Sequence, residues 1–353
     1  MISQAITKEI VLCAITKIDE MGIPKNRSSS MYYLVWNGKL YPPKYILSVA
    51  SNILFGRELL PNEYGGGEET NTFLEKLGFE IIPQTNTMLN RKSVRVSTVV
   101  IQSKSSYERK KRNKNRYIFL AEILKKIPWS NVVLLPAGFF EGKRMSKYSI
   151  DTEVKVVQDA ILEHAPRTTV CFGIDFNNGE DQLALAVDAT GLVALGRKFS
   201  PTKNEVGYIR QASSPFDSEY GYSRVFSVND KKFYLAVCYD CFGLRHDDIK
   251  NPGVEILLVL SHQFQPRGQE NSGDVDFVRK GVAGASKQWN CPTFVTSVFF
   301  DREIPSNWPT GIVWKGEGRS VKTFKYSENS LYWSERSMLT NDMESAISYT
   351  YDI

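Results

Sequence analysis

The sequence lacks the features that would place the protein in a membrane, on a secretory route or in a disulfide-bonded class. None of its apolar runs reaches the roughly 18 residues that a membrane-spanning helix needs. Its first residues show no basic segment followed by an apolar one, so no secretory signal is expected. The five cysteines are an odd, scattered set, which predicts reduced thiols in a cytoplasmic compartment.

Histidine is scarce as well, and this argues against a metal centre. The three histidines in 353 residues are too few and too widely spaced for a convincing cluster of metal ligands. Cys238 and Cys241 form a C-x-x-C pair, but no second pair lies at zinc-finger spacing, and a thioredoxin-like redox pair is the weaker alternative. No glycine-rich stretch ends in the Gly-Lys-Ser/Thr of a phosphate-binding loop. The sequence therefore predicts neither a metal site nor a cofactor.

Positive charge is concentrated in one segment, although the net charge is only +5. Residues 91–126 include 12 basic and 2 acidic residues, whereas the rest of the chain holds 32 basic and 37 acidic residues. The centre of this basic segment, residues 104–116, contains Lys110, Lys111 and Arg112. Such a cluster either attracts the phosphates of a nucleic acid or forms a solvated helix face, and the sequence leaves both interpretations open.

The first 84 residues have the pattern of a small α+β domain. Apolar residues at helical spacing predict a helix over residues 5–21. Two short apolar runs on either side of an Asn37-Gly38 turn predict a β-hairpin. The remaining elements expected in this domain are helices at 44–55 and 69–77 and a strand at 79–82. The polar, aperiodic residues 85–94 that follow are interpreted as a linker.

Two short motifs in this domain, Tyr41-Pro42-Pro43 and Gly78-Phe79, suggest a relationship to a known module. With them, the domain is similar to the small N-terminal module that precedes nuclease domains in McrA-type modification-dependent restriction proteins. Lys39 and Lys44 lie close in sequence to Trp36 and Tyr41, an arrangement suited to a nucleic-acid backbone and a stacked base. The alternative is a half-exposed aromatic edge of the core with solvated lysines.

Beyond the linker, residues 95–338 have the pattern of a layered α/β domain. The strands expected there are largely apolar, which is typical of strands that are buried on both faces. These strands are expected at residues 96–102, 132–135, 170–174, 184–188, 233–239, 256–261 and 293–298. Helices are expected between them at 115–127, 149–164 and 274–288. The polar, weakly patterned residues 339–353 are interpreted as a C-terminal tail.

The segment most suited to chemistry is the end of the apolar run 233–237, which leads directly to Cys238. The chain then turns near Gly243, so the thiol is expected at a strand-to-helix turn. In that position a thiol is exposed for attack, and neighbouring backbone N–H groups can stabilise an oxyanion. The alternative is that Cys238 is a buried apolar residue, as free cysteines commonly are.

The motif Val237-Cys238-Tyr239-Asp240, together with five other segments in the expected order, resembles the nitrilase (carbon–nitrogen hydrolase) superfamily. The other segments are 99–102, 131–136, Leu195-Gly196-Arg197-Lys198, 253–261 and 278–297, and the resemblance extends over about 240 residues. It implies an α-β-β-α sandwich, a small amide or nitrile substrate and self-association into a homo-oligomer.

The resemblance also implies roles for individual residues. Cys238 would be the nucleophile, Lys198 would stabilise the tetrahedral intermediate, and Glu205 would orient groups or handle protons. His262 and Tyr239 would line the substrate pocket, and His262 could equally be a hydrogen-bonded core residue.

One residue departs from the family pattern. The general-base glutamate of the family follows the proline of the second strand, and here that position is Ala137. Glu141, four residues later, or Glu205 would have to replace it. Two functions therefore stay open: an amidase-type hydrolase with an accessory domain, or a catalytically degenerate binding or sensing protein, associated with nucleic acid in a restriction or defence setting.

Overall fold

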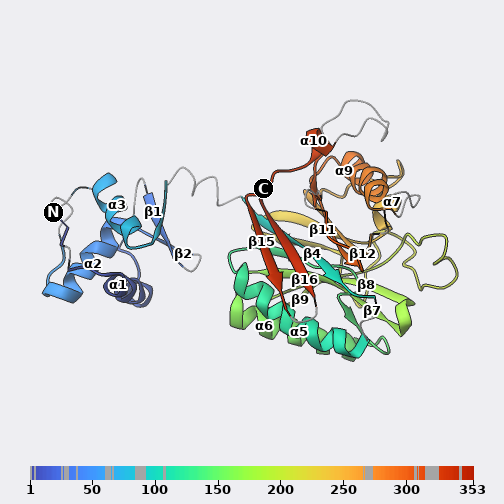
Figure 1. Cartoon of the computed structure of the whole chain (residues 1–353), viewed down its shortest axis with the longest axis horizontal. Helices are drawn as coiled ribbons and strands as arrows, with labels where there is room; N and C mark the ends of the chain where they lie inside the picture. The colour runs from blue at the N-terminus through green and yellow to red at the C-terminus, as the bar shows by residue number, and fades with distance from the viewer. Residues whose placement is uncertain are drawn as a thin grey trace. The chain divides into compact units, whose positions relative to one another are not determined.

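The computed structural model divides the chain into two compact units, Met1–Ser93 and Val94–Ile353 (Figure 1). Each unit has its own hydrophobic core. The residues that the structure describes are 2–3, 5–24, 27, 32–36, 39–59, 65, 67–83, 93–105, 109–264, 266, 273–305, 308, 310–314, 326–341 and 344–353. Most of the expected linker and the Asn37-Gly38 turn lie outside these residues.

The N-terminal unit is a small α+β domain, as expected. Its helices are α1 (Lys8–Met21), α2 (Pro43–Phe55) and α3 (Glu68–Lys76). Its strands β1 (Tyr32–Trp36), β2 (Lys39–Tyr41) and β3 (Glu80–Pro83) form an antiparallel sheet in the order β2-β1-β3. Val11, Ala14, Ile15 and Ile18 recur at helical spacing in α1 and are buried, so this helix forms one wall of the core.

The C-terminal unit contains a large mixed sheet. Its strands are β4 (Arg95–Ser103), β5 (Val132–Leu134), β6 (Phe140–Glu141), β7 (Thr169–Phe176), β8 (Asp181–Asp188), β9 (Gly191–Arg197), β10 (Val225–Val228), β11 (Lys231–Val237), β12 (Ile256–Gln263), β13 (Thr293–Phe300), β14 (Gly311–Ile312), β15 (Glu335–Thr340) and β16 (Ser345–Asp352). The main path through the described strands is β10-β11-β12-β13-β4-β5-β7-β8-β9.

Helices cover this sheet system on both sides. They are α5 (Arg109–Lys126), α6 (Lys147–His164), α7 (Asp240–Leu244), α8 (Asp274–Asp276), α9 (Ala283–Trp289) and α10 (Tyr326–Asn329), with a 3₁₀ turn at Asn177–Gly179 and a π-helical turn at Phe277–Val282. Figure 1 shows α5 and α6 on one side of the strands, and α7 and α9 on the other. Within the described residues, no helix has both the length and the apolar composition to cross a lipid bilayer.

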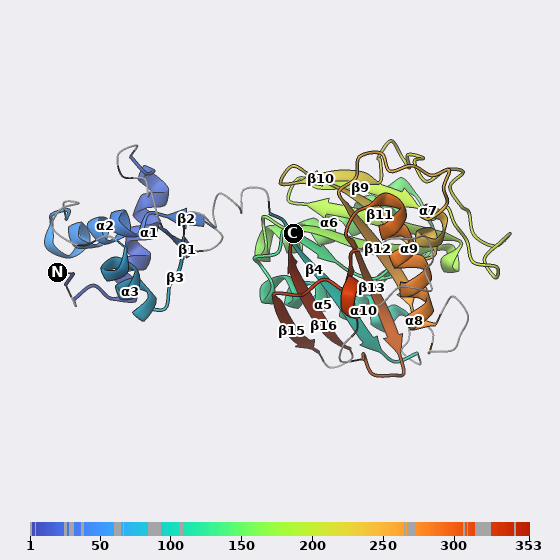
Figure 2. The same cartoon turned by 90° about the horizontal axis from the view of Figure 1, so that it is seen from above.

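Strand β4 joins the two halves of the sheet. The first half of β4 pairs with β5, its second half pairs with β13, and its other edge pairs with β16 along its length. Alternate residues of β4 enter different cores: Val99 and Ile101 pack with α5 and α6, whereas Val96 and Val100 face the strands of the other half. This alternation explains the apolar strands and gives the expected α/β layers, which Figure 2 shows from above.

The C-terminal residues correct one expectation. The segment 339–353, interpreted from its polarity as a tail, contains the whole of β16, which pairs with β4 from Ser345 to Asp352. Tyr349 and Tyr351 are buried there, and Thr350 shares a hydrogen bond with Ser97. Serine, threonine and tyrosine make the strand look polar in sequence, although the hydroxyls of Thr350 and Tyr351 are hydrogen-bonded inside the unit to Ser97 and Thr310.

The direction of the strands determines where a functional site can form. One set of strands in the sheet runs parallel, so the carboxyl ends of these strands lie at one edge: β11, β12, β13, β4, β5 and β7. Strand β9 points the same way as β7, because each is antiparallel to β8. Side chains at the ends of these strands are therefore brought together although they are far apart in sequence.

Candidate active site

Cys238 follows β11 directly and has an unusual backbone conformation. Its φ of 48° is in the left-handed region, which is costly for a residue with a β-carbon. Its N–H donates to the carbonyl of Leu260 at 2.6 Å, and this bond ties the turn to β12. The side chain is half-buried, and its Sγ lies 3.7 Å from Oγ of Ser261. The sequence-predicted turn thus presents the thiol at the edge of the sheet.

Lys198 follows β9 directly and is held by two polar side chains. Its ammonium lies 2.6 and 2.7 Å from the two carboxylate oxygens of Glu205, and it donates to Oε1 of Gln182 at 3.0 Å. Glu205 also accepts from the amide of Gln182 and from the backbone N–H of Thr202. With only 1% of the Lys198 residue exposed, the ammonium is fixed in position by these acceptors.

Charges in the site act on one another. Burial raises the pKa of the Cys238 thiol, but the positive charges of Lys198 and His262 outweigh burial and lower it to about 7. Burial lowers the pKa of Lys198, but the negative charges of Cys238 and Glu205 raise it overall. Burial also raises the pKa of Glu205, and the Lys198 ammonium reverses this and lowers it to about 2. Cys238 is therefore brought close to Lys198 and Glu205, although it is far from both in sequence.

His262, in β12, directly follows Ser261, whose hydroxyl is next to the thiol. Its Nε2 is 3.1 Å from Oδ1 of Asp175, which is near the end of β7. Burial lowers the pKa of the imidazole, but Asp175 and Cys238 outweigh burial and raise it to about 10. The charges of Cys238 and His262 each shift the pKa of the other, and Ser261, the residue before His262, has its Oγ 3.7 Å from the Cys238 Sγ. Asp175 was missed from the sequence, where its only signal is a carboxylate in an apolar strand.

The chain around Ala137 passes beside this pair. The N–H of Ala137 donates to the carbonyl of Ser261 at 3.2 Å, which joins the ends of β5 and β12. A β-carbon on Gly138 would lie 2.9 Å from Oδ2 of Asp175 and 3.3 Å from Cδ2 of His262. Asp175 and His262 therefore occupy the space beside Gly138. Gly138 directly follows Ala137, the position at which the resemblance places a glutamate.

Glu141 is placed differently from the role suggested for it. It is in β6 opposite Asp175, and its carboxylate forms a 3.2 Å ion pair with Arg112 of α5. The side chain of Asn113 donates to its backbone carbonyl at 2.6 Å. Glu141 therefore joins α5 to the end of the sheet, and Arg112, expected in a nucleic-acid surface, is half-buried in that ion pair.

A buried ion pair between Asp240 and Arg224 holds the backbone next to Cys238 and Lys198. Asp240 accepts hydrogen bonds from the backbone N–H groups of Val237, Phe199 and Ser200, and from the guanidinium of Arg224 at 3.2 Å. Neither Asp240 nor Arg224 is more than 1% exposed. Because Asp240 binds the residue before Cys238 and the two after Lys198, it fixes the distance between these strand ends.

The remaining predicted site residues are spread over both units. Tyr239 is half-buried next to the thiol, and its ring stacks on Phe242 with centroids 4.1 Å apart. In the N-terminal unit, Tyr41 is buried and its hydroxyl donates to Asp19 at 2.9 Å, so its ring is not available for base stacking. Trp36 packs edge-on against Phe79 in the same core.

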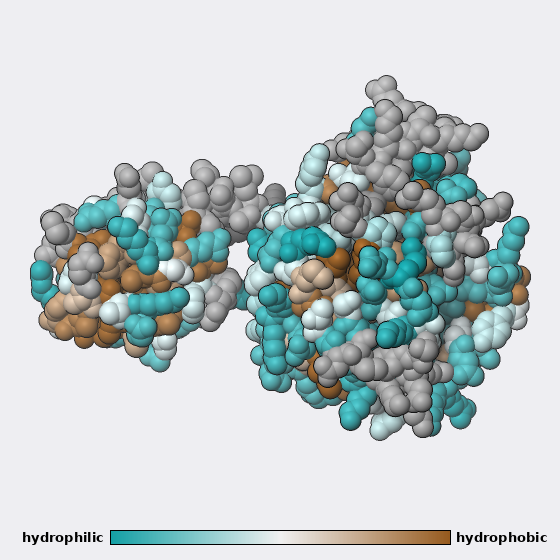
Figure 3. All heavy atoms as spheres, viewed as in Figure 1, coloured by the Kyte–Doolittle hydropathy of each residue, from teal (hydrophilic) through white to brown (hydrophobic). Residues whose placement is uncertain are grey.

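Little of the expected nucleic-acid surface can be placed. The side chains of Lys39, Lys110 and Lys111 lie outside the described residues, and Lys44 is half-buried near the start of α2. On the face seen in Figure 3, hydrophobic residues gather on the N-terminal unit, and hydrophilic residues cover most of the C-terminal unit.

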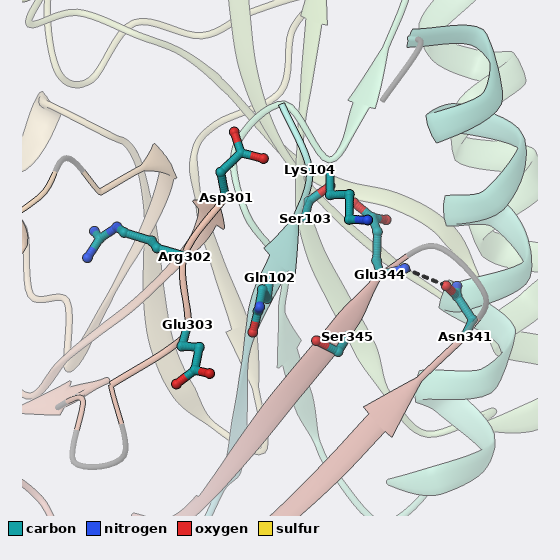
Figure 4. Close-up of a pocket in the computed structure, with 9 residues that line it drawn as sticks. All are labelled: Gln102, Ser103, Lys104, Asp301, Arg302, Glu303, Asn341, Glu344 and Ser345. Carbon is teal, nitrogen blue, oxygen red and sulfur yellow. Dashed lines mark hydrogen bonds between the residues drawn. The ribbon is translucent and has the colours of Figure 1, made fainter. Parts of the chain in front are cut away.

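Two other features of the C-terminal unit lie apart from this chemistry. A surface pocket of about 570 Å³ opens where β4 and β13 end and β16 begins (Figure 4). Its lining combines charges of both signs and includes none of the residues around Cys238: Gln102, Ser103, Lys104, Asp301, Arg302, Glu303, Asn341, Glu344 and Ser345. Among the described residues, no group of three or more histidine, cysteine, aspartate or glutamate side chains is arranged to hold a metal ion.

The chain thus consists of a small α+β unit, followed along the sequence by an α/β unit in which Cys238, Lys198 and Glu205 meet. Residues 4–83 match the family described as the ScoMcrA-like N-terminal head domain, which covers the small unit alone and confirms the resemblance seen in its sequence. No curated protein sequence matches the chain.

Solved structures similar to the chain include members of the nitrilase superfamily. An amidase variant from Nesterenkonia sp. AN1, with acrylamide added at its active-site cysteine, has 13% identity and a TM-score of 0.43, over 72% of this chain and 92% of the amidase. A CN-hydrolase superfamily protein from Xanthomonas campestris has 12% identity and a TM-score of 0.42, over 61% and 78% of the two chains.

A glutamine-dependent NAD⁺ synthetase from Cytophaga hutchinsonii is also similar, with 12% identity and a TM-score of 0.42 over 58% of this chain. The similar region covers 36% of the synthetase, so the chain matches about a third of that protein.

Proposed function

We propose that the C-terminal unit is a cysteine-dependent carbon–nitrogen hydrolase of amidase type, with Cys238 as nucleophile. The observation that carries this proposal is the half-buried thiol at the end of β11 with its pKa lowered to about 7. A thiol of this kind is partly thiolate at neutral pH, and thiolate is the attacking form. A structural cysteine would more commonly be buried with a raised pKa, as Cys171 is.

Lys198 supplies the second requirement of acyl transfer. Attack of the Cys238 thiolate on an amide carbonyl places a negative charge on the carbonyl oxygen. An ammonium that is already held in place stabilises that charge without reorganisation, which is worth about 10²–10³ in rate for a single donor. Both oxygens of Glu205 are bound to Lys198, so Glu205 keeps this ammonium charged and oriented. The substrate class is a small amide or nitrile, and we expect Tyr239, the residue after the nucleophile, to contact it.

Alkylation by iodoacetamide tests the nucleophile without knowledge of the substrate. We expect the rate at Cys238, followed by peptide mass spectrometry, to rise with a midpoint near pH 7. At neutral pH, Cys238 should react several-fold faster than an ordinary thiol with a pKa of about 8.5. Cys13, exposed on α1, provides the comparison in the same molecule. Slow and equal alkylation of both cysteines would contradict the hydrolase and favour the alternative, a degenerate binding or sensing protein.

Hydrolysis itself is tested on a panel of short aliphatic amides and nitriles by measuring released ammonia. We expect turnover with at least one class of substrate, and no turnover by the Cys238→Ser variant. Ammonia release that is equal in the two proteins would mean that Cys238 is not the nucleophile.

For the N-terminal unit and the basic segment 104–116 we propose contact with nucleic acid, on the strength of the local charge of 12 basic against 2 acidic residues in 91–126. The full chain should bind heparin and a DNA duplex with an affinity that falls steeply with salt. A Lys110→Glu/Lys111→Glu variant should elute at lower salt than the unmodified chain. Equal elution of the two proteins would remove this segment from the proposal. Self-association and a cytoplasmic location stay predictions from the sequence.

A further inference from the structure

We propose that His262 is a catalytic residue that exchanges protons with Cys238, and that Asp175 is the positioning residue that holds it. Cys238, His262 and Asp175 would thus act as a cysteine–histidine–aspartate relay inside a nitrilase-like fold. The catalytic part of this inference rests on the proposed hydrolase function, whereas the coupling of the three groups rests on geometry alone.

The relay follows from the strand ends. Cys238 follows β11, His262 is the last residue but one of β12, and Asp175 is the last residue but one of β7. Strands β11 and β12 are neighbours in register, whereas β7 belongs to the other half of the sheet. The imidazole thus lies where the two halves meet at their carboxyl edge.

His262 has two acidic groups among its neighbours. Its Nε2 is bound to Asp175 at 3.1 Å, so Nδ1 is the ring nitrogen left for proton exchange. The thiol lies against the same strand, because Cys238 donates its N–H to Leu260 and its Sγ is 3.7 Å from Oγ of Ser261, the residue before His262. Gly138 leaves no room on this side for a β-carbon, so Asp175 and His262 are closely packed against the chain that follows β5. An imidazole held between a carboxylate and a thiol is the arrangement that stabilises imidazolium beside thiolate.

Glu205 and Glu141 are each bound to a positively charged side chain. Both oxygens of Glu205 are bound to the ammonium of Lys198, and the pKa of Glu205 is lowered to about 2, so it takes up no proton at neutral pH. The carboxylate of Glu141 is bound to Arg112. Ala137 carries no proton-transfer group. His262 is therefore the group near the thiol that can give a proton to the leaving amine, because formation of the C–S bond removes the thiolate charge that helps to raise the pKa of the imidazole.

The proton balance of the reaction can be written with these groups. In the resting state Cys238 is thiolate and His262 is imidazolium. The thiolate forms a C–S bond with the amide carbon, Lys198 stabilises the oxyanion, and His262 gives its proton to the amine as the C–N bond breaks. Neutral His262 then takes a proton from water as that water attacks the thioester. Collapse breaks the C–S bond, releases the carboxylic acid and restores thiolate and imidazolium.

The test compares the pH dependence of Cys238 alkylation in full-length variants. His262→Asn should move the midpoint upward from about pH 7 and slow alkylation at pH 7 roughly tenfold, because the positive partner of the thiolate is gone. Asp175→Asn, which keeps the size of the side chain, should shift the midpoint in the same direction by less. His246→Asn, at an exposed histidine, is the matched control and should leave the profile unchanged.

This measurement separates the relay from the hydrolase. It needs no turnover, so the relay is tested even if the wild-type chain hydrolyses none of the amides tried. If turnover is found, His262→Asn should lower kcat by about 10²–10⁴. An unchanged alkylation midpoint in both His262→Asn and Asp175→Asn, in proteins whose circular dichroism shows them to be folded, would overturn the proposal. If His262→Asn does not fold, Asp175→Asn decides the question alone.

Discussion

The ammonium of Lys198 lies between the two carboxylate oxygens of Glu205, at 2.6 and 2.7 Å. Within the described residues, the oxygens of this carboxylate accept hydrogen bonds from Lys198, Gln182 and the backbone of Thr202. Because all three are donors, Glu205 acts as a counter-ion for Lys198 and not as a proton acceptor. This arrangement gives the lysine a fixed charge beside Cys238 and leaves proton transfer to another group.

Replacing Glu205 with Gln should weaken the site through Lys198. The amide keeps the shape but removes the negative charge, so the ammonium loses most of its stabilisation and its position is less defined. We expect kcat/KM for a substrate amide to fall by roughly 10²-fold, as for loss of an oxyanion donor. The matched control is Glu219→Gln, a partner of Arg197 one residue before the lysine. Equal losses in the two variants would mean that the effect is structural.

The same carboxylate should make stability depend on pH. The folded-state pKa of Glu205 is lowered from 4.5 to about 2, so its contribution is fully present above pH 4.5 and is lost as the pH falls towards 2. The upper limit of this contribution is about 3 kcal/mol. Urea unfolding between pH 6 and pH 3 should show the free-energy difference between wild type and Glu205→Gln shrinking as the pH falls. A difference that is constant with pH would contradict this assignment.

The sequence predicts the parts of the site that depend on local pattern. An apolar run that ends in a cysteine gives both β11 and the exposed turn, and the order of segments gives Lys198 after its own strand. Cys238 and Lys198 reach one edge because β9 points the same way as β7 and because Asp240 binds the backbone next to both residues. Periodicity predicts the strand and the turn at Cys238, whereas the site role of Lys198 follows from the resemblance to the nitrilase superfamily.

The sequence does not predict the partners that meet across the sandwich. His262 and Asp175 are 87 residues apart, and nothing in either strand indicates that their side chains face each other. Strand β16 was missed for a similar reason, because its threonine, serine and tyrosine residues hide a buried strand that pairs with β4. Both depend on which strands become neighbours, which is a property of the whole fold.

Removing the carboxylate of Asp240 should destabilise the protein strongly. In Asp240→Ala the guanidinium of Arg224 stays buried without its counter-ion, and the backbone N–H groups at both strand ends lose their acceptor. Loss of one partner of a buried pair costs about 3–5 kcal/mol. Asp159→Ala, which breaks an exposed pair with Lys155, should change the free energy of unfolding by less than about 1 kcal/mol. Urea unfolding of both variants measures the contrast, and similar costs would show that the buried pair is not structural.

A methyl group at Gly138 should disturb the pair formed by Asp175 and His262 without removing either residue. Gly138 has a φ of +58°, and a β-carbon there would lie 2.9 Å from the Asp175 carboxylate. Gly138→Ala should therefore push the carboxylate from the imidazole and raise the midpoint of Cys238 alkylation. Gly253→Ala separates backbone strain from this contact, because Gly253 has a φ of +83° and a β-carbon there would meet no described atom within 4 Å. Both variants should lose about 1 kcal/mol of stability from the left-handed backbone. Only Gly138→Ala should change the alkylation profile; identical profiles would show that the Asp175–His262 contact tolerates displacement and does not control the thiol.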